Sequence, residues 1–392
     1  MPWKKWFPED QRVQFIVEAT QGPSSVADLC RAFGVSRKTG FKWLRRYDGF
    51  GASGLVDQSR APHTHPNSVP EELADRLVGL RRAHPTWGPR KVLAALRNLE
   101  PKLELPAAST VGELFKRHNL VTPRPPGRRR SPPMTDPFGS CTEPNDVWCT
   151  DFKGYFRTRD GARCDPLTLT DAVSRYLLRC YAVKRTDEAN VRLVFTSAFA
   201  EFGLPLAIRS DNGTPFASAG AGGLTRLSIW WVRLGIRPER IEPGHPEQNG
   251  RHERMHRTLK DETARPPRQT LRAQQLAFDR FRKEYNEERP HEALNQHPPA
   301  TVYRPSPRSL PAKLPDLEYP AHWELRHVKL GGEIKWKGRM VYVNSALASE
   351  VVGIEEVSEA THVVRFGPIE LGRIKDDLPH LGLIWPRRPK KR

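Results

Sequence analysis

The sequence has few cysteines, no long apolar run and no secretion signal, and each absence argues against a class of protein. Five cysteines are scattered over 392 residues, so they form neither a disulfide framework nor the paired spacing of a structural zinc site. No apolar stretch approaches the roughly 20 residues that span a bilayer. Residues 1–10 are polar and aromatic, so no signal peptide is expected. We therefore expect a cytoplasmic protein without a membrane anchor.

Acidic residues are scarce relative to basic ones. The 64 Lys and Arg residues exceed the 45 Asp and Glu residues, which gives a formal net charge of +19. This surplus favours a nucleic-acid partner, because basic side chains that neutralise phosphates release condensed counterions. Hydrophobic residues make up 37% of the chain, which is a globular balance. The length predicts about two to four domains.

Residues 1–60 predict a helix-turn-helix domain. Helical patterns over residues 8–20 and 26–33 precede Gly34, which can adopt the positive φ of a tight turn. A third helix is predicted over residues 37–47, and it would enter the major groove. Its candidate DNA-binding residues are Arg37, Lys38, Lys42, Arg45 and Arg46. The alternative is an ordinary helical hairpin with a solvated charged face.

Residues 61–121 predict a second helix-turn-helix-like domain, because three more helical patterns cover residues 71–83, 88–99 and 109–118. A Pro/Arg-rich linker follows at residues 122–139, since proline density this high excludes helix and sheet interiors. The linker contributes three candidate DNA-binding residues, Arg128, Arg129 and Arg130. A merely solvated spacer is the alternative.

The second half of the chain predicts two further domains. Strand patterns at 147–156, 167–182 and 206–208 alternate with helical patterns over residues 140–305 and indicate a central α/β domain. Residues 306–380 contain short runs rich in Val, Ile, Trp and Tyr with glycine turns between them, which predict a small SH3-like β-barrel. Residues 381–392 form a basic tail.

Three acidic residues stand out in the α/β region. Asp151 lies inside an apolar strand pattern, where a carboxylate costs free energy unless a cation or hydrogen-bond donors compensate. Asp211 ends another apolar strand and opens a turn sequence. Glu253 lies near the start of a basic helix whose spacing places Arg257 and Lys260 on its face. Each acid alone has an ordinary structural explanation, but together in a basic chain they favour a metal site.

The region around these acids resembles the DDE recombinases of the retroviral-integrase superfamily, in particular bacterial insertion-sequence transposases. The likeness rests on four stretches and the acid that follows them: VWCTDF at 147–152, LTDAVSR at 169–175, IRSDNGTPF at 208–216, PGHPEQNG at 243–250 and Glu253. It covers roughly residues 140–305 closely. The helix-turn-helix domains before this region and the β domain after it fit the family more loosely.

This resemblance implies an RNase H-like fold in which Asp151, Asp211 and Glu253 are catalytic residues and ligands of two Mg²⁺ or Mn²⁺ ions. Water would attack at the element end and free a 3′ hydroxyl, which would then attack target DNA. The implied partners are double-stranded DNA, as transposon ends and as target, and further copies of the chain on paired ends. The sequence does not show whether an accessory ATPase is needed.

The spacing of the third acid departs from the family pattern. Asp211 and Glu253 are 42 positions apart (253 − 211), whereas relatives commonly have a shorter separation. Glu247 matches the shorter separation but follows a proline in an irregular Pro/Gly stretch. Glu253 is preferred because it lies on a helix three residues after Gly250. The extra residues are assigned to the Gly/Ala/Ser loop at 217–223.

The residues around the acids are expected to have supporting roles. Asn212 and Gly213 would shape the turn of the second ligand. His245, Gln248 and Asn249 would contact the scissile strand. The candidate phosphate-binding residues of the basic helix are Arg254, Arg257 and Lys260, although a run of charges is usually a solvated face.

Two other functions compete with a transposase. One is a catalytically silent DNA-binding regulator or target-capture protein derived from such an enzyme, which a missing acid would have favoured. The other is a metal-dependent nuclease that hydrolyses DNA without strand transfer. Joined product from a donor with a 3′ hydroxyl separates the transposase from both.

Overall fold

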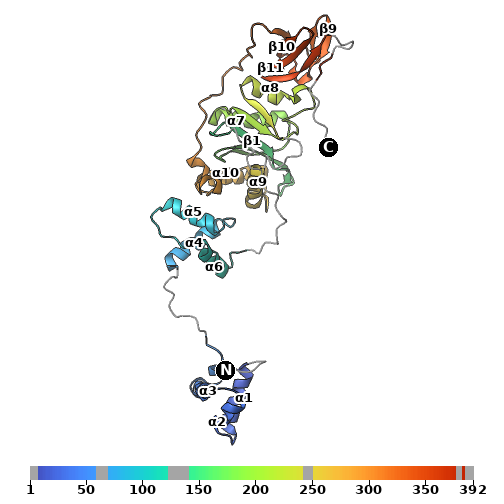
Figure 1. Cartoon of the computed structure of the whole chain (residues 1–392). Helices are drawn as coiled ribbons and strands as arrows, with labels where there is room; N and C mark the ends of the chain where they lie inside the picture. Colours follow the sequence, from blue (N-terminus) through green and yellow to red (C-terminus); the bar gives the residue numbers. More distant parts are fainter. Residues whose placement is uncertain (1–7, 59–68, 122–140, 242–249, 377–381, 385–392) are drawn as a thin grey trace. The chain divides into compact units, whose positions relative to one another are not determined.

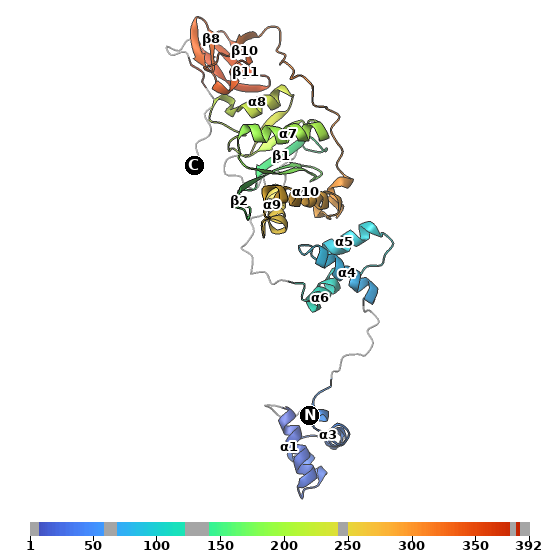
Figure 2. The same cartoon turned by 180° about the vertical axis from the view of Figure 1, so that it is seen from behind.

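The structure is a computed structural model that describes residues 8–58, 69–121, 141–241, 250–376 and 382–384. The chain divides into two compact units, Met1–Val69 and Pro70–Arg392, and each is described by itself (Figures 1 and 2). Within the described ranges, no helix combines the length and the apolar character that crossing a membrane requires.

The first unit is a small three-helix domain. Its elements are α1 (Pro8–Gln21), α2 (Val26–Ala32), α3 (Arg37–Phe50) and a 3₁₀ turn (Gly51–Leu55). Ser25 and Ser36 cap α2 and α3, each accepting a hydrogen bond from the backbone N–H three residues later. Gly34 has a φ of 67° in the turn between these helices, as the sequence predicts. The helices pack around Phe15, Leu29 and Trp43.

The second unit begins with a helical module, residues 70–121. It consists of α4 (Glu71–Ala83), α5 (Pro89–Leu99) and α6 (Ala108–Arg117), close to the predicted helices. Trp87, Val92 and Phe115 are fully buried at its centre, so the apolar positions that predicted the helices form a core of their own.

A six-stranded mixed sheet forms the centre of the second unit. Its strands are β1 (Val147–Phe152), β2 (Phe156–Arg157), β3 (Arg163–Asp171), β4 (Leu177–Val183), β5 (Ala207–Ser210) and β6 (Arg237–Arg240). They follow the order β2-β3-β1-β5-β6, with β4 paired to β3. The β1–β5 and β5–β6 pairs are parallel, and the other pairs are antiparallel.

Helices cover both faces of this sheet (Figure 1). The covering helices are α7 (Glu188–Phe202), α8 (Arg226–Arg233), α9 (Gly250–Thr263) and α10 (Leu271–Glu287). Phe195 and Trp231 of α7 and α8 pack with Trp148 and Leu167 of the sheet. On the other side, α9 and α10 pack against β3 and β4 through a second cluster that includes Leu259. Trp230 and Trp231 are buried.

Two strand boundaries differ from the sequence pattern. The continuous strand-like run at 167–182 is two antiparallel strands, because the chain turns at Asp171. Its carboxylate accepts hydrogen bonds from the backbone N–H groups of Asn145 and Ser174 at 2.7 Å each and from the Ser174 hydroxyl at 2.6 Å. The expected strand at 147–156 ends at Phe152, and β6 has no counterpart among the expected strands.

The C-terminal part is a β domain, as the sequence predicts, but a closed barrel is not confirmed. Its strands are β7 (Glu324–His327), β8 (Glu333–Trp336), β9 (Arg339–Tyr342), β10 (Val351–Ser358), β11 (Thr361–Phe366) and β12 (Ile369–Lys375). They form an open four-stranded antiparallel sheet, β12-β11-β10-β7, and a separate β8–β9 hairpin. The core of this β domain also contains Leu224, Ile229 and Val232 from the α/β region.

Candidate active site at the ends of β1 and β5

Asp151 and Asp211 lie at the same edge of the sheet. In the parallel β1–β5 pair, Cys149 is the partner of Arg209, and each aspartate follows its strand's member of this pair by two residues. Side chains two residues apart on a strand point to the same face, and paired strands run about 4.8 Å apart. The register therefore brings the two aspartates to the carboxyl ends of adjacent strands.

The turn after β5 holds Asp211 in place. The backbone N–H of Gly213 donates to Asp211 Oδ1 at 3.1 Å, and a Cβ at position 213 would lie 3.1 Å from Oδ2. Asn212 Nδ2 donates to the carbonyl of Ile241 at 2.9 Å, which ties the turn to the segment after β6. A side chain at position 213 would crowd the carboxylate, so glycine suits this position.

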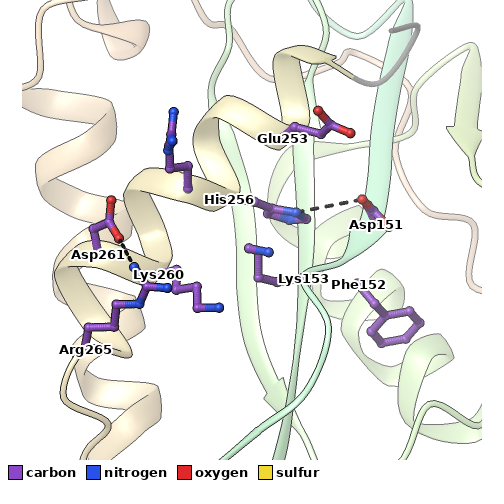
Figure 3. Close-up of a pocket in the computed structure, with 9 residues that line it drawn as sticks. Asp151, Phe152, Lys153, Glu253, His256, Lys260, Asp261 and Arg265 are labelled. Carbon is purple, nitrogen blue, oxygen red and sulfur yellow. Dashed lines mark hydrogen bonds and ion pairs between the residues drawn. The ribbon is translucent and has the colours of Figure 1, made fainter. Parts of the chain in front are cut away.

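The third candidate acid, Glu253, lies in the first turn of α9. Asp151 and Glu253 both line a pocket of about 600 Å³ (Figure 3). The other lining residues are Phe152, Lys153, His256, Arg257, Lys260, Asp261 and Arg265. Asp211 is not among the lining residues. The pocket therefore contains two of the three acids, and Asp211 is related to Asp151 only through the pairing of β1 with β5.

The helix that carries Glu253 is attached to the sheet by two buried histidines. His252 Nε2 lies 2.6 Å and His256 Nε2 2.7 Å from Thr168 Oγ1 on β3. Thr168 is the antiparallel partner of Asp151, and His256 Nδ1 lies 3.8 Å from Asp151 Oδ2. Sequence reasoning missed these histidines; their signal was a spacing of four, which places both on one helix face.

Burial disfavours the protonated form of both imidazoles. Burial lowers the pKa of His252 to about 3. Burial also lowers the pKa of His256, and the neighbouring His252 and Lys153 lower that pKa further. A cation in this pocket would therefore not face a positively charged His256.

The basic residues of the pocket are only partly those that the sequence predicts. Arg257 and Lys260 line it with Glu253, whereas Arg254 is exposed on α9 outside the lining. Lys153 and Arg265 also line it and were missed. The signal for Lys153 was its position two residues after Asp151, because side chains two residues apart along an extended chain point to the same face.

The predicted DNA-binding residues of α3 are mostly exposed. Arg37, Lys38, Lys42 and Arg45 are exposed. Arg46 is half-buried; its guanidinium donates to the carbonyl of Val56 at 2.8 Å and lies 4.7 Å from the centre of the Trp43 ring. Seven further residues named from the sequence lie outside the described residues: Arg128, Arg129, Arg130, His245, Glu247, Gln248 and Asn249.

The donor types of the site fit a hard divalent cation, since Asp151, Asp211 and Glu253 all offer carboxylate oxygens. Their arrangement is open. Within the described ranges, no three His, Cys, Asp or Glu side chains converge into a group that could hold a metal ion. The residues that would hold a cation are thus the two strand-end aspartates, with Glu253 on the pocket wall.

Comparisons with protein families support this description. Two models of an integrase core domain match residues 142–246 and 234–299, which supports an RNase H-like core. A helix-turn-helix domain model matches residues 11–63, and a homeodomain-like domain model matches residues 39–115. The N-terminal helices are therefore of helix-turn-helix type rather than an ordinary hairpin.

Curated relatives come from bacterial insertion elements. The uncharacterized 39.2 kDa protein of insertion element IS476 from Xanthomonas euvesicatoria is 29% identical over 257 residues, which cover 64% of this chain and 70% of the relative. The uncharacterized 31.7 kDa protein of insertion element IS407 from Burkholderia multivorans is 26% identical over 251 residues, covering 64% and 86%.

Among solved structures, the chain is similar to the HTLV-2 integrase catalytic core domain in complex with magnesium. That similarity has 16% identity and a TM-score of 0.33, over 41% of this chain and 98% of that one. It is also similar to a chain of the simian T-cell lymphotropic virus intasome, with 15% identity and a TM-score of 0.37, over 79% and 100%. The integrase-core matches and the insertion-element relatives together support a DDE transposase of the retroviral-integrase superfamily.

Proposed function

We propose that the protein binds transposon ends, cleaves their 3′ strands and joins them to target DNA, with Asp151, Asp211 and Glu253 as catalytic ligands of two Mg²⁺ or Mn²⁺ ions. The proposal is supported by the β1–β5 register, in which both aspartates follow paired residues at the carboxyl ends of adjacent strands. Glu253 lines the same pocket as Asp151.

Each part of the site has a role in phosphoryl transfer. When bound, two divalent cations supply Lewis-acid activation of the attacking oxygen and stabilise the leaving oxygen of an in-line displacement. Asp151 is held by its pairing with Thr168 of β3, and the turn at Gly213 holds Asp211. Such rigid placement lowers the barrier by fixing the reacting groups before the reaction.

The basic residues of the pocket would bind the DNA backbone. Arg257, Lys260 and Lys153 lie beside the carboxylates, where they would contact phosphates on either side of the scissile bond. Arg254 would contact DNA further out along α9. The exposed basic side chains of α3 would hold the end sequence in the major groove. Two ends must be held together, so a homo-oligomer on DNA in the bacterial cytoplasm is part of the proposal.

The experiment is strand transfer with purified full-length protein, a labelled element end and a plasmid target in Mg²⁺ or Mn²⁺. Joined product is expected from the wild type and from Glu247→Gln. We expect Asp151→Asn, Asp211→Asn and Glu253→Gln to lose at least about a hundredfold in rate, because each removes a charge that stabilises the transition state.

Each other outcome points to a different function. Binding of the ends without cutting or joining would replace the proposal with a catalytically silent regulator. Cutting without joining would favour a nuclease. Loss of joining in Glu247→Gln with full activity in Glu253→Gln would move the third acid to position 247.

A further inference from the structure

The Thr168 hydroxyl contacts three groups but has one proton to donate. Thr168 Oγ1 lies 3.1 Å from the carbonyl oxygen of Asp151 and within 2.7 Å of the Nε2 atoms of His252 and His256. Nε2 of each imidazole therefore has the Thr168 hydroxyl as its hydrogen-bond partner.

This arrangement leaves Nδ1 of each ring for another partner. Nδ1 of His252 has its partner within the protein, because Thr170 Oγ1 lies 3.2 Å from it. His256 Nδ1 instead faces Asp151 Oδ2 at 3.8 Å. Figure 3 shows the His256 ring directed toward the Asp151 carboxylate from α9, the helix that carries Glu253.

We propose that His256 Nδ1 is a nitrogen ligand of the divalent cation held by Asp151. The inference rests on the proposed function in one respect, the role of Asp151 as a metal ligand. A cation about 2.1 Å from a nitrogen and about 2.1 Å from an oxygen can bridge atoms up to about 4.2 Å apart. The 3.8 Å separation lies within this reach. Water and DNA oxygens would complete the coordination.

A nitrogen ligand changes which metal the site prefers. Mg²⁺ takes oxygen ligands almost exclusively, whereas Mn²⁺ also accepts imidazole and stands below the later transition metals in affinity. We expect tighter binding of Mn²⁺ than of Mg²⁺ by the wild type, and a smaller difference once the nitrogen is removed.

A purely structural role for His256 predicts different behaviour. The His256→Gln variant places an amide near the position of Nε2, so it keeps a donor for Thr168 but has no atom equivalent to Nδ1. His252 is the matched control, because it is equally buried and binds the same hydroxyl but directs its Nδ1 to Thr170. His252→Gln disturbs the same network without removing a proposed ligand.

The experiment is Mn²⁺ binding by full-length wild type, His256→Gln and His252→Gln. Affinity is measured by electron paramagnetic resonance titration, and bound nitrogen by the ¹⁴N modulation of the spin echo. We expect ¹⁴N coupling in the wild type and in His252→Gln. Loss of the coupling in His256→Gln should accompany a fall in affinity of about tenfold or more, the scale typical of weakened metal sites. Circular dichroism checks that each variant is folded.

Asp151→Asn separates the two proposals. If the wild type shows no ¹⁴N coupling, or if the coupling persists in His256→Gln, His256 is not a ligand. Loss of Mn²⁺ binding in Asp151→Asn would then leave the acidic site standing. If Mn²⁺ binding is unchanged in Asp151→Asn, the acidic site itself is wrong and the inference about His256 is overturned with it.

Discussion

The α/β core has two interfaces within residues 70–392, and they differ in chemistry. Toward the β domain it contributes Leu224, Ile229 and Val232 to one continuous apolar cluster. Toward the helical module it makes polar contacts. These are Thr86 Oγ1 to Glu262 Oε1 at 2.5 Å, His84 Nδ1 to Glu284 Oε1 at 2.9 Å, Lys91 Nζ to the Pro290 carbonyl at 2.6 Å and Asn98 Nδ2 to the Gln296 carbonyl at 2.9 Å.

This difference separates a permanent junction from a separable one. Close-packed apolar clusters belong to single cooperative units, whereas polar interfaces between domains resemble transient complexes. The core and the β domain should therefore unfold together, and the helical module should detach without unfolding the core. The loop after Asp211 belongs to the permanent junction, because Asn344 of the β domain donates to the carbonyls of Ala221 and Leu224 at 3.1 and 3.4 Å.

The largest effect is expected from Val232→Asp in the apolar junction. Val232 is 3% exposed on α8 and lies against Gly367 of the β domain. An unpaired carboxylate there should cost about 4 kcal/mol or more of unfolding free energy. Urea denaturation should show the core and the β domain losing structure in one transition at lower urea. Val357→Asp, at an exposed position of β10, is the control. Separate transitions for the two parts would contradict the shared core.

A smaller effect is expected from Asn344→Ala. The buried amide of Asn344 holds the loop after Asp211, and its loss should cost about 1–3 kcal/mol. Hydrogen exchange of residues 213–224 should accelerate. Asn98→Ala removes the matching amide-to-carbonyl bond from the exposed polar interface, so its effect on unfolding should be a few tenths of a kcal/mol. Equal losses of unfolding free energy in Asn344→Ala and Asn98→Ala would contradict the distinction between the apolar and the polar interface.

The polar interface should respond locally to Thr86→Val. This near-isosteric change removes the hydrogen bond to Glu262 and should weaken docking of the helical module by about 1 kcal/mol. Limited proteolysis should cut the module faster while the core keeps its urea midpoint. Thr196→Val on the exposed side of α7 should leave both unchanged. A lowered core midpoint in Thr86→Val would show that this interface is also permanent.

Near neutral pH the smallest effect comes from Lys91. Burial and, to a smaller extent, the charge of Arg289 lower the pKa of Lys91 to about 8, and Glu262 and Glu292 oppose this shift. Between pH 8 and the ordinary value of 10.5, the undocked module binds more protons than the docked one. Docking should therefore strengthen as pH rises through this window.

The test for Lys91 is the rate of proteolysis of the module at pH 7.5 and pH 10 in wild type and Lys91→Met. The methionine carries no charge at either pH, so the difference in pH dependence between the two proteins is the contribution of the Lys91 charge. If docking of the wild-type module weakened from pH 7.5 to pH 10 relative to docking in the variant, the assigned sign would be wrong.

Local patterns predicted most elements of this protein but not how they meet. Helix α3 was predictable because Gly34 supplies the tight turn that precedes it. The break between β3 and β4 was missed because apolar patterns lie on both sides of residues 171–175, and the turn depends on contacts of Asp171 with Asn145. Barrel closure was over-predicted, since short strands with glycine turns also form open sheets.

The candidate site shows the same limit. Asp151 and Asp211 were recognisable because a carboxylate beside an apolar strand is costly. The contact of His256 with Thr168 joins residues 88 positions apart, and sequence spacing on one helix does not reveal it. Thr86 and Glu262 are 176 positions apart, so the polar interface was equally invisible.

The central claim is that the ends of β1 and β5 and the first turn of α9 form one metal site. It is tested most directly by loading the full-length protein with Fe²⁺ in place of Mg²⁺ and mapping backbone cleavage by locally generated hydroxyl radicals. We expect cuts near residues 151, 211 and 253 that disappear together in Asp151→Asn. Cuts at only one of these segments, or cuts that persist in Asp151→Asn, would contradict it.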